Sequence, residues 1–211
     1  MQKIVPAILT DSAADLAKKL KILAGNTQWV QIDVMDGLFV PEISVPLSVL
    51  EELADDFDYE IHLMVQDPAS YLETCQAVGA KRVIFHIEGV KNPEHVFQEM
   101  QKYSFERGIA LSPETQLDVV KKWQQQIDSL LFLSIHPGKQ GREFIPSVLE
   151  KIRALRMFSL DILLGVDGGI NEPEEFKRVF EAGADYVVVG SGIWKSKDPI
   201  AALRKLEAMV Q

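Results

Sequence analysis

Residues 161–191, DILLGVDGGINEPEEFKRVFEAGADYVVVGS, carry the pattern that predicts the fold most clearly. The stretch opens with an apolar run that predicts a strand over Asp161 to Asp167, followed by a glycine pair and a helical pattern over 172–183. A second apolar run then predicts a strand over Tyr186 to Ser191. Both runs are apolar at consecutive positions, which fits parallel strands that are covered on both faces.

The same alternation of strand and helix repeats along the rest of the chain. The other predicted strands are Lys3 to Leu9, Trp29 to Met35, Tyr59 to Val65, Arg82 to Ile87, Gly108 to Ser112 and Leu130 to Ile135. The other helical patterns cover residues 11–24, 45–56, 68–79, 92–104, 116–128, 144–158 and 198–210. Such units can close into a (β/α)8 TIM barrel or lie open as a doubly wound sheet, and eight nearly equal units favour the barrel.

Length and composition set the domain count and the compartment. The chain has 211 residues, of which 47% are hydrophobic, and it contains no linker or low-complexity tract. This length is near the lower limit for a barrel, so we expect a single domain over residues 1–211. One cysteine, Cys75, cannot form an intrachain disulfide, and no segment resembles a signal peptide or a membrane span. A cytoplasmic location is therefore expected.

The charge balance limits the class of partner. Acidic residues number 31 and basic residues 22, which gives a formal net charge of -9. A general electrostatic attraction to nucleic acid or to an anionic membrane is therefore not expected. Any anionic ligand has to be held by local groups.

Three groups capable of chemistry lie at predicted strand ends, where barrels carry their active sites. Side chains alternate along a strand, so Asp33, His62 and Asp167 are expected to meet at one opening. Each alone fits a loop-capping aspartate or a hydrogen-bonded histidine. Together they indicate a functional site, because buried carboxylates are costly unless they are paired or bind a cation.

Glycine-rich turns follow the last three predicted strands. They read Gly138-Lys139-Gln140-Gly141-Arg142, Gly168-Gly169 and Gly190-Ser191-Gly192. Turns at these positions of a barrel commonly bind phosphate through backbone N–H groups and a helix N-terminus. They predict a local phosphate site in an acidic chain, with Lys195 or the cations of the first turn nearby.

The remaining histidines support simpler interpretations. His86 and Glu88 lie on one face of a strand end and are expected to form a hydrogen-bonded pair in the barrel wall. His95 belongs to a polar helical stretch and is expected on the surface. His136, next to Pro137, is either a loop anchor or a substrate contact.

Short motifs at the strand ends, taken in order, resemble the ribulose-phosphate 3-epimerases of the pentose phosphate pathway. The resemblance extends over nearly the whole chain. Its motifs include Pro6-Ala7-Ile8-Leu9, Asp33-Val34-Met35-Asp36-Gly37, His62-Leu63-Met64-Val65, His86-Ile87-Glu88, His136-Pro137-Gly138, Val166-Asp167-Gly168-Gly169-Ile170 and Val189-Gly190-Ser191.

This resemblance implies a (β/α)8 barrel of the ribulose-phosphate-binding type that interconverts D-ribulose 5-phosphate and D-xylulose 5-phosphate by proton transfer at C3. It implies that Asp33 and Asp167 are the acid/base pair, and that both bind a divalent Zn, Fe, Mn or Co ion together with His62. A metal touching both oxygens of the enediolate would stabilise its negative charge. The implied substrate contacts are Met35, Met64, His62, Gly138, Gly141, Gly168, Gly169, Gly190 and Ser191.

Several positions depart from the family pattern. Gln31 stands where the family has its second histidine ligand, and an amide oxygen binds most metals more weakly than imidazole. We expect this exchange to cost at least about 10–100-fold in metal affinity or activity. The other changed positions are Ala7 for serine, Leu38 for histidine, Glu42 for asparagine, Leu133 for methionine, and Gln140 within the phosphate loop.

These departures keep two alternatives open. One is a non-catalytic protein that binds sugar phosphates, and the other is an enzyme that uses the same carboxylates in an aldol cleavage or a decarboxylation. In every case the expected partner is a small sugar phosphate. Related barrels often dimerise, so a homo-oligomer is one expectation, with no particular interface indicated.

Overall fold

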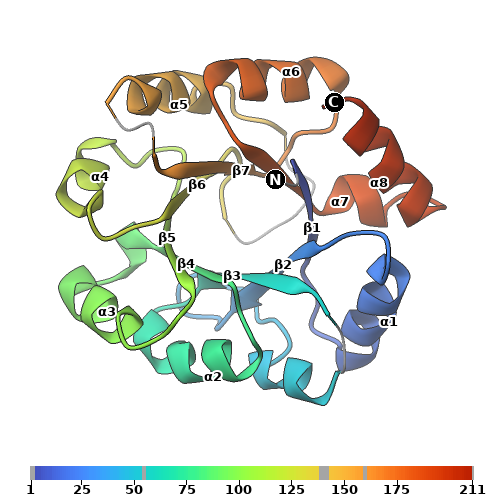
Figure 1. The fold of residues 1–211 in the computed structure, drawn as a ribbon, viewed down its shortest axis with the longest axis horizontal. Coiled ribbons are helices and arrows are strands. Elements are labelled where there is room, and N and C mark those ends of the chain that lie inside the picture. The colour runs from blue at the N-terminus through green and yellow to red at the C-terminus, as the bar shows by residue number, and fades with distance from the viewer. Residues whose placement is uncertain (1–2, 54–55, 138–142, 159–160, 211) are drawn as a thin grey trace.

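A computed structural model of the chain describes residues 3–53, 56–137, 143–158 and 161–210. Eight parallel strands form a closed barrel in which each pairs with its neighbours in sequence and β8 pairs with β1 (Figure 1). The barrel predicted from the sequence is confirmed, and the open sheet is excluded. The strands are β1 (Ile4–Ile8), β2 (Trp29–Met35), β3 (Asp58–Met64), β4 (Arg82–His86), β5 (Glu106–Leu111), β6 (Ser129–Leu133), β7 (Leu163–Asp167) and β8 (Tyr186–Val189).

Helices surround the barrel and cover the outward faces of the strands (Figure 1). Their apolar sides pack against outward-facing strand residues in one large hydrophobic cluster. The α-helices are α1 (Ala13–Leu23), α2 (Leu72–Ala77), α3 (Pro93–Met100), α4 (Asp118–Trp123), α5 (Val148–Arg156), α6 (Pro173–Ala182), α7 (Ser191–Trp194) and α8 (Pro199–Ala208). Three 3-10 helices, η1 (Leu47–Glu52), η2 (Pro68–Tyr71) and η3 (Ile87–Gly89), lie between them.

Several predicted elements have different bounds in the structure. In place of the helix predicted over 45–56, the described residues form the 3-10 helix η1, which follows Pro46 and has no side-chain cap at its start; residues 54 and 55 lie outside the described residues. The strand predicted over Tyr186 to Ser191 ends at Val189, because the chain turns at Gly190 and Ser191 begins the short helix α7. The turn matters for the site, since it brings backbone groups to the carboxyl end of the barrel.

A buried polar cluster fills the amino-terminal end of the barrel interior. The Arg82 guanidinium donates to Glu60 Oε2 over 2.6 Å and to Glu106 Oε2 over 2.8 Å. The Tyr186 hydroxyl donates to the same Glu60 oxygen over 2.8 Å, and Arg82 also lies over the Trp29 ring. These contacts neutralise Glu60, which is fully buried.

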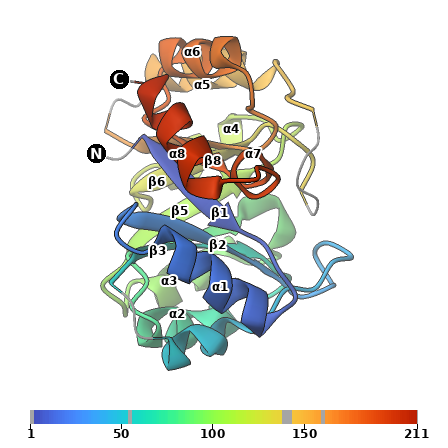
Figure 2. The same ribbon diagram turned by 90° about the vertical axis from the view of Figure 1, so that its right-hand side faces the viewer.

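The opposite end of the barrel is the open one. In the side view of Figure 2 both chain termini lie on the left, and the loop after β2 projects to the right.

No helix within the described residues combines the length and the apolarity that crossing a membrane requires. Cys75 is buried, and burial raises the pKa of its thiol to about 12, so the residue serves packing.

Candidate active site

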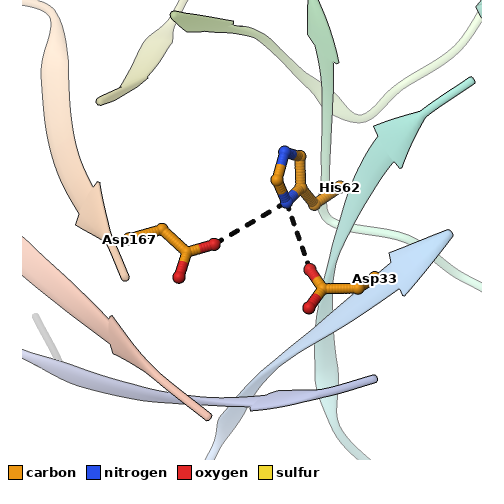
Figure 3. Close-up of side chains that lie close together, drawn as sticks. All are labelled: Asp33, His62 and Asp167. Atoms are coloured by element: carbon orange, nitrogen blue, oxygen red, sulfur yellow. Dashed lines mark hydrogen bonds and ion pairs between the residues drawn. The ribbon is translucent and has the colours of Figure 1, made fainter. Parts of the chain in front are cut away.

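The three predicted residues meet at the carboxyl ends of their strands. Asp33 on β2 and His62 on β3 are cross-strand neighbours in register, and Asp167 is the last residue of β7. One ring nitrogen of the buried His62, Nδ1, lies 3.1 Å from Asp33 Oδ1 and 3.7 Å from Asp167 Oδ2. Figure 3 shows both carboxylates directed toward this nitrogen. The predicted convergence is therefore confirmed as geometry.

Gln31 belongs to the same cluster and lies two residues before Asp33, on the same face of β2. Its Nε2 donates to Asp33 Oδ1 over 2.8 Å and to Asp167 Oδ2 over 3.0 Å. Its Oε1 is buried and has no hydrogen-bond partner. The amide thus holds the two carboxylates close together, and its acceptor is unused.

A chain of hydrogen bonds continues from His62 into the barrel wall. His62 Nε2 lies 3.1 Å from His86 Nε2, and His86 Nδ1 lies 3.3 Å from Glu88 Oε1. Glu88 Oε1 also accepts the Ser112 backbone N–H over 2.7 Å. The expected His86 and Glu88 pair is confirmed, and its contact with His62 is additional.

The direction of this chain follows from its last member. Glu88 Oε1 accepts, so His86 donates through Nδ1, and a neutral His86 then accepts at Nε2 from His62. His62 Nδ1 is left with its lone pair facing the two aspartates. A lone pair beside two carboxylates is unfavourable unless a proton or a metal cation lies between them.

Electrostatics in the cluster favour positive charge and disfavour a second negative charge. Burial lowers the pKa of His62, but the hydrogen bond to Asp33 and the charges of both aspartates outweigh it and raise that pKa overall. Burial, and next the charge of Asp33, raise the pKa of Asp167 to about 7. Asp167 can therefore hold or release a proton near neutral pH.

The donor atoms are spaced as cation ligands are. One atom from each of Asp33, His62 and Asp167 lies within 4.8 Å of the other two. Two ligands about 2.0–2.2 Å from a zinc ion are separated by up to roughly 4.4 Å, so small shifts suffice. The group can hold a divalent cation, with imidazole and carboxylate donors that suit zinc, iron, manganese or cobalt.

One pocket contains this group together with two of the glycine turns. Its lining includes Met35 and Met64 and the turns after β7 and β8, whose contact with substrate stays a prediction. The lining residues are Leu9, Asp33, Met35, His62, Met64, Leu133, Ile135, Asp167, Gly168, Gly169, Ile170, Asn171, Val188, Val189, Gly190, Ser191 and Gly192. The two carboxylates and the glycine turns after β7 and β8 therefore share one opening.

Part of the predicted phosphate site lies outside the described residues. Gly138, Lys139, Gln140, Gly141 and Arg142 all belong to the segment 138–142. Lys195, the other cation considered, is exposed at the end of α7 and is absent from the pocket lining. Among the described lining residues of the pocket, the turns after β7 and β8 contribute no lysine or arginine.

Ser134, which no sequence pattern had indicated, holds the end of β7. The buried Ser134 donates its backbone N–H to Asp167 O over 2.8 Å. Its hydroxyl donates to Gly168 O over 2.5 Å. A serine at the end of an apolar strand, next to a predicted site, was the signal that could have identified it.

The changed positions occupy different surroundings. Ala7 is buried inside the barrel and Leu133 lines the pocket, whereas Leu38 is exposed on the loop after β2. His95 is exposed, as expected. His136 is exposed as well and lies 3.2 Å from Glu114, which favours the loop-anchor interpretation.

Comparisons with known sequences agree with the motifs. Residues 3–194 match the model of the ribulose-phosphate 3 epimerase family. A ribulose-phosphate 3-epimerase of Mycobacterium bovis is 36% identical over 96% of this chain and 90% of its own length. Those of Bacillus subtilis and Helicobacter pylori are 31% and 32% identical over 98% and 99% of this chain, and each is matched over 98% of its own length.

Comparisons with solved structures agree with the fold. A mutant tryptophan synthase alpha-subunit from Pyrococcus furiosus aligns with a TM-score of 0.72 over 99% of this chain and 97% of its own, at 12% identity. The orotidine 5'-phosphate decarboxylase of Pyrococcus horikoshii aligns with a TM-score of 0.69 over 98% of both chains, at 14% identity. At such low identity these matches show the barrel alone.

Proposed function

This chain belongs to the ribulose-phosphate 3-epimerase family, and from that premise we propose that it interconverts D-ribulose 5-phosphate and D-xylulose 5-phosphate. The observation that supports the proposal most directly is the meeting of Asp33, His62 and Asp167 in the pocket lined by the glycine turns. The pocket thus offers acid/base groups and phosphate-binding groups to the same small molecule.

In the proposed reaction, one aspartate removes the proton from C3 and the other returns a proton to the opposite face. Asp33 and Asp167 extend from β2 and β7, and in the proposed complex a ketose bound over the cluster presents opposite faces of C3 to the two carboxyl groups. The electron pair left by the C–H bond moves into the neighbouring carbonyl and gives an enediolate. The raised pKa of Asp167 suits a group that exchanges protons at neutral pH.

The donor set fits a divalent cation, which we propose is bound by Asp33, His62 and Asp167 with Gln31 beside them. When bound, such a cation supplies positive charge that lowers the energy of the enediolate. His86 and Glu88 orient the His62 ring through the hydrogen bonds described above, as outer groups of metal sites commonly do.

The phosphate is proposed to bind at the glycine turns. Gly168 and Gly169 have φ of +105° and +70°, which turns the chain sharply after β7 and leaves the backbone uncovered. Gly190 and Ser191 begin α7 on the neighbouring strand. Backbone N–H groups bind phosphate without adding charged side chains, which suits the acidic chain.

The test is exchange of the C3 proton. Protein supplied in turn with zinc, iron, manganese and cobalt is mixed with ribulose 5-phosphate in deuterated water and followed by NMR. We expect deuterium at C3 and formation of xylulose 5-phosphate. An Asp167→Asn variant should lose about 10²–10⁴-fold in this rate, because it cannot act as acid or base.

The control is Asp118→Asn, which removes an exposed carboxylate from α4 and should leave the rate unchanged. If the wild-type protein exchanges no C3 proton with any of the four metals, the proposal is wrong. Sugar-phosphate binding without turnover would then identify a non-catalytic relative, and other products would identify another enediolate reaction.

A further inference from the structure

Two buried acceptors near the candidate site have no hydrogen-bond partner. Within the described residues, Gln31 Oε1 and Glu60 Oε1 are two of three such side-chain atoms, the third being Ser129 Oγ. Both Gln31 and Glu60 are fully buried. A buried polar atom that is left unpaired carries a desolvation cost, so each of these oxygens calls for a partner.

The two residues are neighbours inside the barrel. Gln31 on β2 pairs in register with Glu60 on β3, and such strands lie about 4.8 Å apart. By the alternation of side chains, both face the interior together with Asp33 and His62.

The present orientation of the Gln31 amide cannot serve a cation. Its Nε2 points to Asp33 and Asp167, and an amide nitrogen donates hydrogen bonds but offers no acceptor site. The terminal torsion of glutamine is broad and roughly two-fold, so the amide can turn over within nearly the same space. After half a turn, Oε1 faces the two aspartates and the Nε2 hydrogens face the opposite side.

We propose that Gln31 has two amide orientations and that Glu60 is the positioning residue that stabilises the cation-binding one. In that orientation Gln31 Oε1 binds the cation held by Asp33, His62 and Asp167, and Gln31 Nε2 donates to Glu60 Oε1. Both unpaired oxygens then have partners. The inference rests on the proposed function in so far as it requires a divalent cation at this site.

Glu60 is prepared for this role by its other oxygen. Arg82 and Tyr186 both donate to Oε2, which fixes the carboxylate and leaves Oε1 available. Without a cation, the Gln31 amide hydrogens take the place of positive charge between the two aspartates. By stabilising the cation-binding orientation of Gln31, Glu60 compensates for a ligand that is weaker than imidazole.

The first test is Glu60→Gln. Its amide oxygen can still accept from Arg82 and Tyr186, while its amide hydrogens meet Gln31 Oε1 and stabilise the orientation that does not bind the cation. We expect zinc affinity, measured by titration against a competing chelator, to fall by at least about tenfold. The matched control is Glu106→Gln, which removes the other carboxylate from Arg82 and should change zinc affinity less than about twofold.

A second variant separates positioning from general damage. Gln31→Met removes the amide, so adding Glu60→Gln to it should change zinc affinity little further. If Glu60→Gln lowers zinc affinity as much in the Gln31→Met background as in the wild-type background, Glu60 acts without Gln31. That result would overturn the inference. Wild-type zinc affinity in Glu60→Gln would overturn it as well.

A measurement on the wild-type protein covers the case in which Glu60→Gln does not fold. With diamagnetic Zn²⁺, the Gln31 amide protons should gain NMR contacts to the Glu60 side chain and lose those to Asp33 and Asp167. Unchanged contacts on zinc binding, or no zinc binding at all, would show that the amide stays a donor and would reject the inference. These readouts use zinc without substrate, so their failure is distinct from a failure of C3 exchange.

Discussion

At the level of single residues, Asp167 is the position where the charge arrangement of the site conflicts most with stability. Its carboxyl group is close to Asp33, and Gln31 donates one amide group to both. Two carboxylates so close together resist holding two negative charges, and burial strengthens that resistance. This arrangement lowers the stability of the folded protein by an amount that depends on pH.

The pKa of Asp167 predicts the sign of that dependence. In the metal-free protein the folded-state pKa is about 7 against an ordinary value of 3.8. Between these values the folded chain binds more protons than the unfolded chain, so stability falls as pH rises from about 4 to about 7. The raised pKa of His62 acts in the same direction.

We therefore expect urea unfolding in the presence of a chelator to show wild-type protein losing stability between pH 5 and pH 8. Asp167→Asn should lose much less over the same range. Asp128→Asn, at a partly exposed carboxylate paired with Arg107, serves as the control and should follow the wild-type curve. Parallel curves for the wild type and Asp167→Asn would contradict the assignment.

Residue identities in the site were largely predictable, whereas their hydrogen bonds were not. Period-two alternation and the strand-end rule were enough to bring Asp33, His62 and Asp167 together. Nothing in a linear pattern shows that His86 contacts His62, because that contact depends on how β3 and β4 are staggered around the barrel. The role of Ser134 was hidden for the same reason.

At the level of elements, the turn after β7 shows how glycine serves the site. Gly169 has φ of +70°, and a Cβ there would lie 2.6 Å from the Phe144 backbone nitrogen. Only glycine therefore allows β7 to end beneath the segment that begins at residue 143. The close approach and the positive φ both require glycine at this position.

We expect Gly169→Ala to raise KM for ribulose 5-phosphate by about tenfold or more, since displaced backbone N–H groups lose charged hydrogen bonds worth about 1.5–3 kcal/mol. Steady-state kinetics measures this effect. The control is Gly79→Ala, which has φ of +75° with nothing within 4 Å of the added Cβ. It should lose about 1–2 kcal/mol of stability and keep its KM. An unchanged KM in Gly169→Ala would argue against phosphate binding at this turn.

Element boundaries were predicted least well where local signals are short. The pattern over 45–56 has helical spacing, but Pro46 and the lack of a side-chain cap reduce it to η1. The helix α7 has four residues, too few for a periodic pattern to reveal. It forms because Gly190 turns the chain and because the Trp194 indole N–H donates to Ala7 O over 2.6 Å, a contact between distant segments.

At the level of the whole molecule, the barrel interior is divided into two polar ends. The amino-terminal end contains the cluster of Arg82, Glu60 and Tyr186, and the carboxyl-terminal end contains the candidate site. A buried ion pair adds little net stability compared with apolar packing, yet the loss of one partner leaves an unpaired buried charge. The cluster therefore makes the fold sensitive to single substitutions.

Arg82→Ala should lower the free energy of unfolding by about 3–5 kcal/mol, because the Glu60 carboxylate would remain buried without the guanidinium group that neutralises it. Urea denaturation at neutral pH measures the change. The comparison variant is Arg107→Ala, which removes a partly exposed arginine paired with Asp128 and should cost at most about 1 kcal/mol. Equal losses in the two variants would show that burial of the pair carries no special cost.

The sequence alone was enough to predict the barrel, the carboxyl-terminal position of the site and the three residues at its centre. It could do so because apolar periodicity and side-chain alternation are properties of consecutive residues. Which atoms face one another is visible only in the folded barrel, as in the two acceptors left unpaired at Gln31 and Glu60 and in the hydrogen-bond chain from His62 to Glu88. These contacts join separate strands, and their geometry is fixed only when the barrel closes.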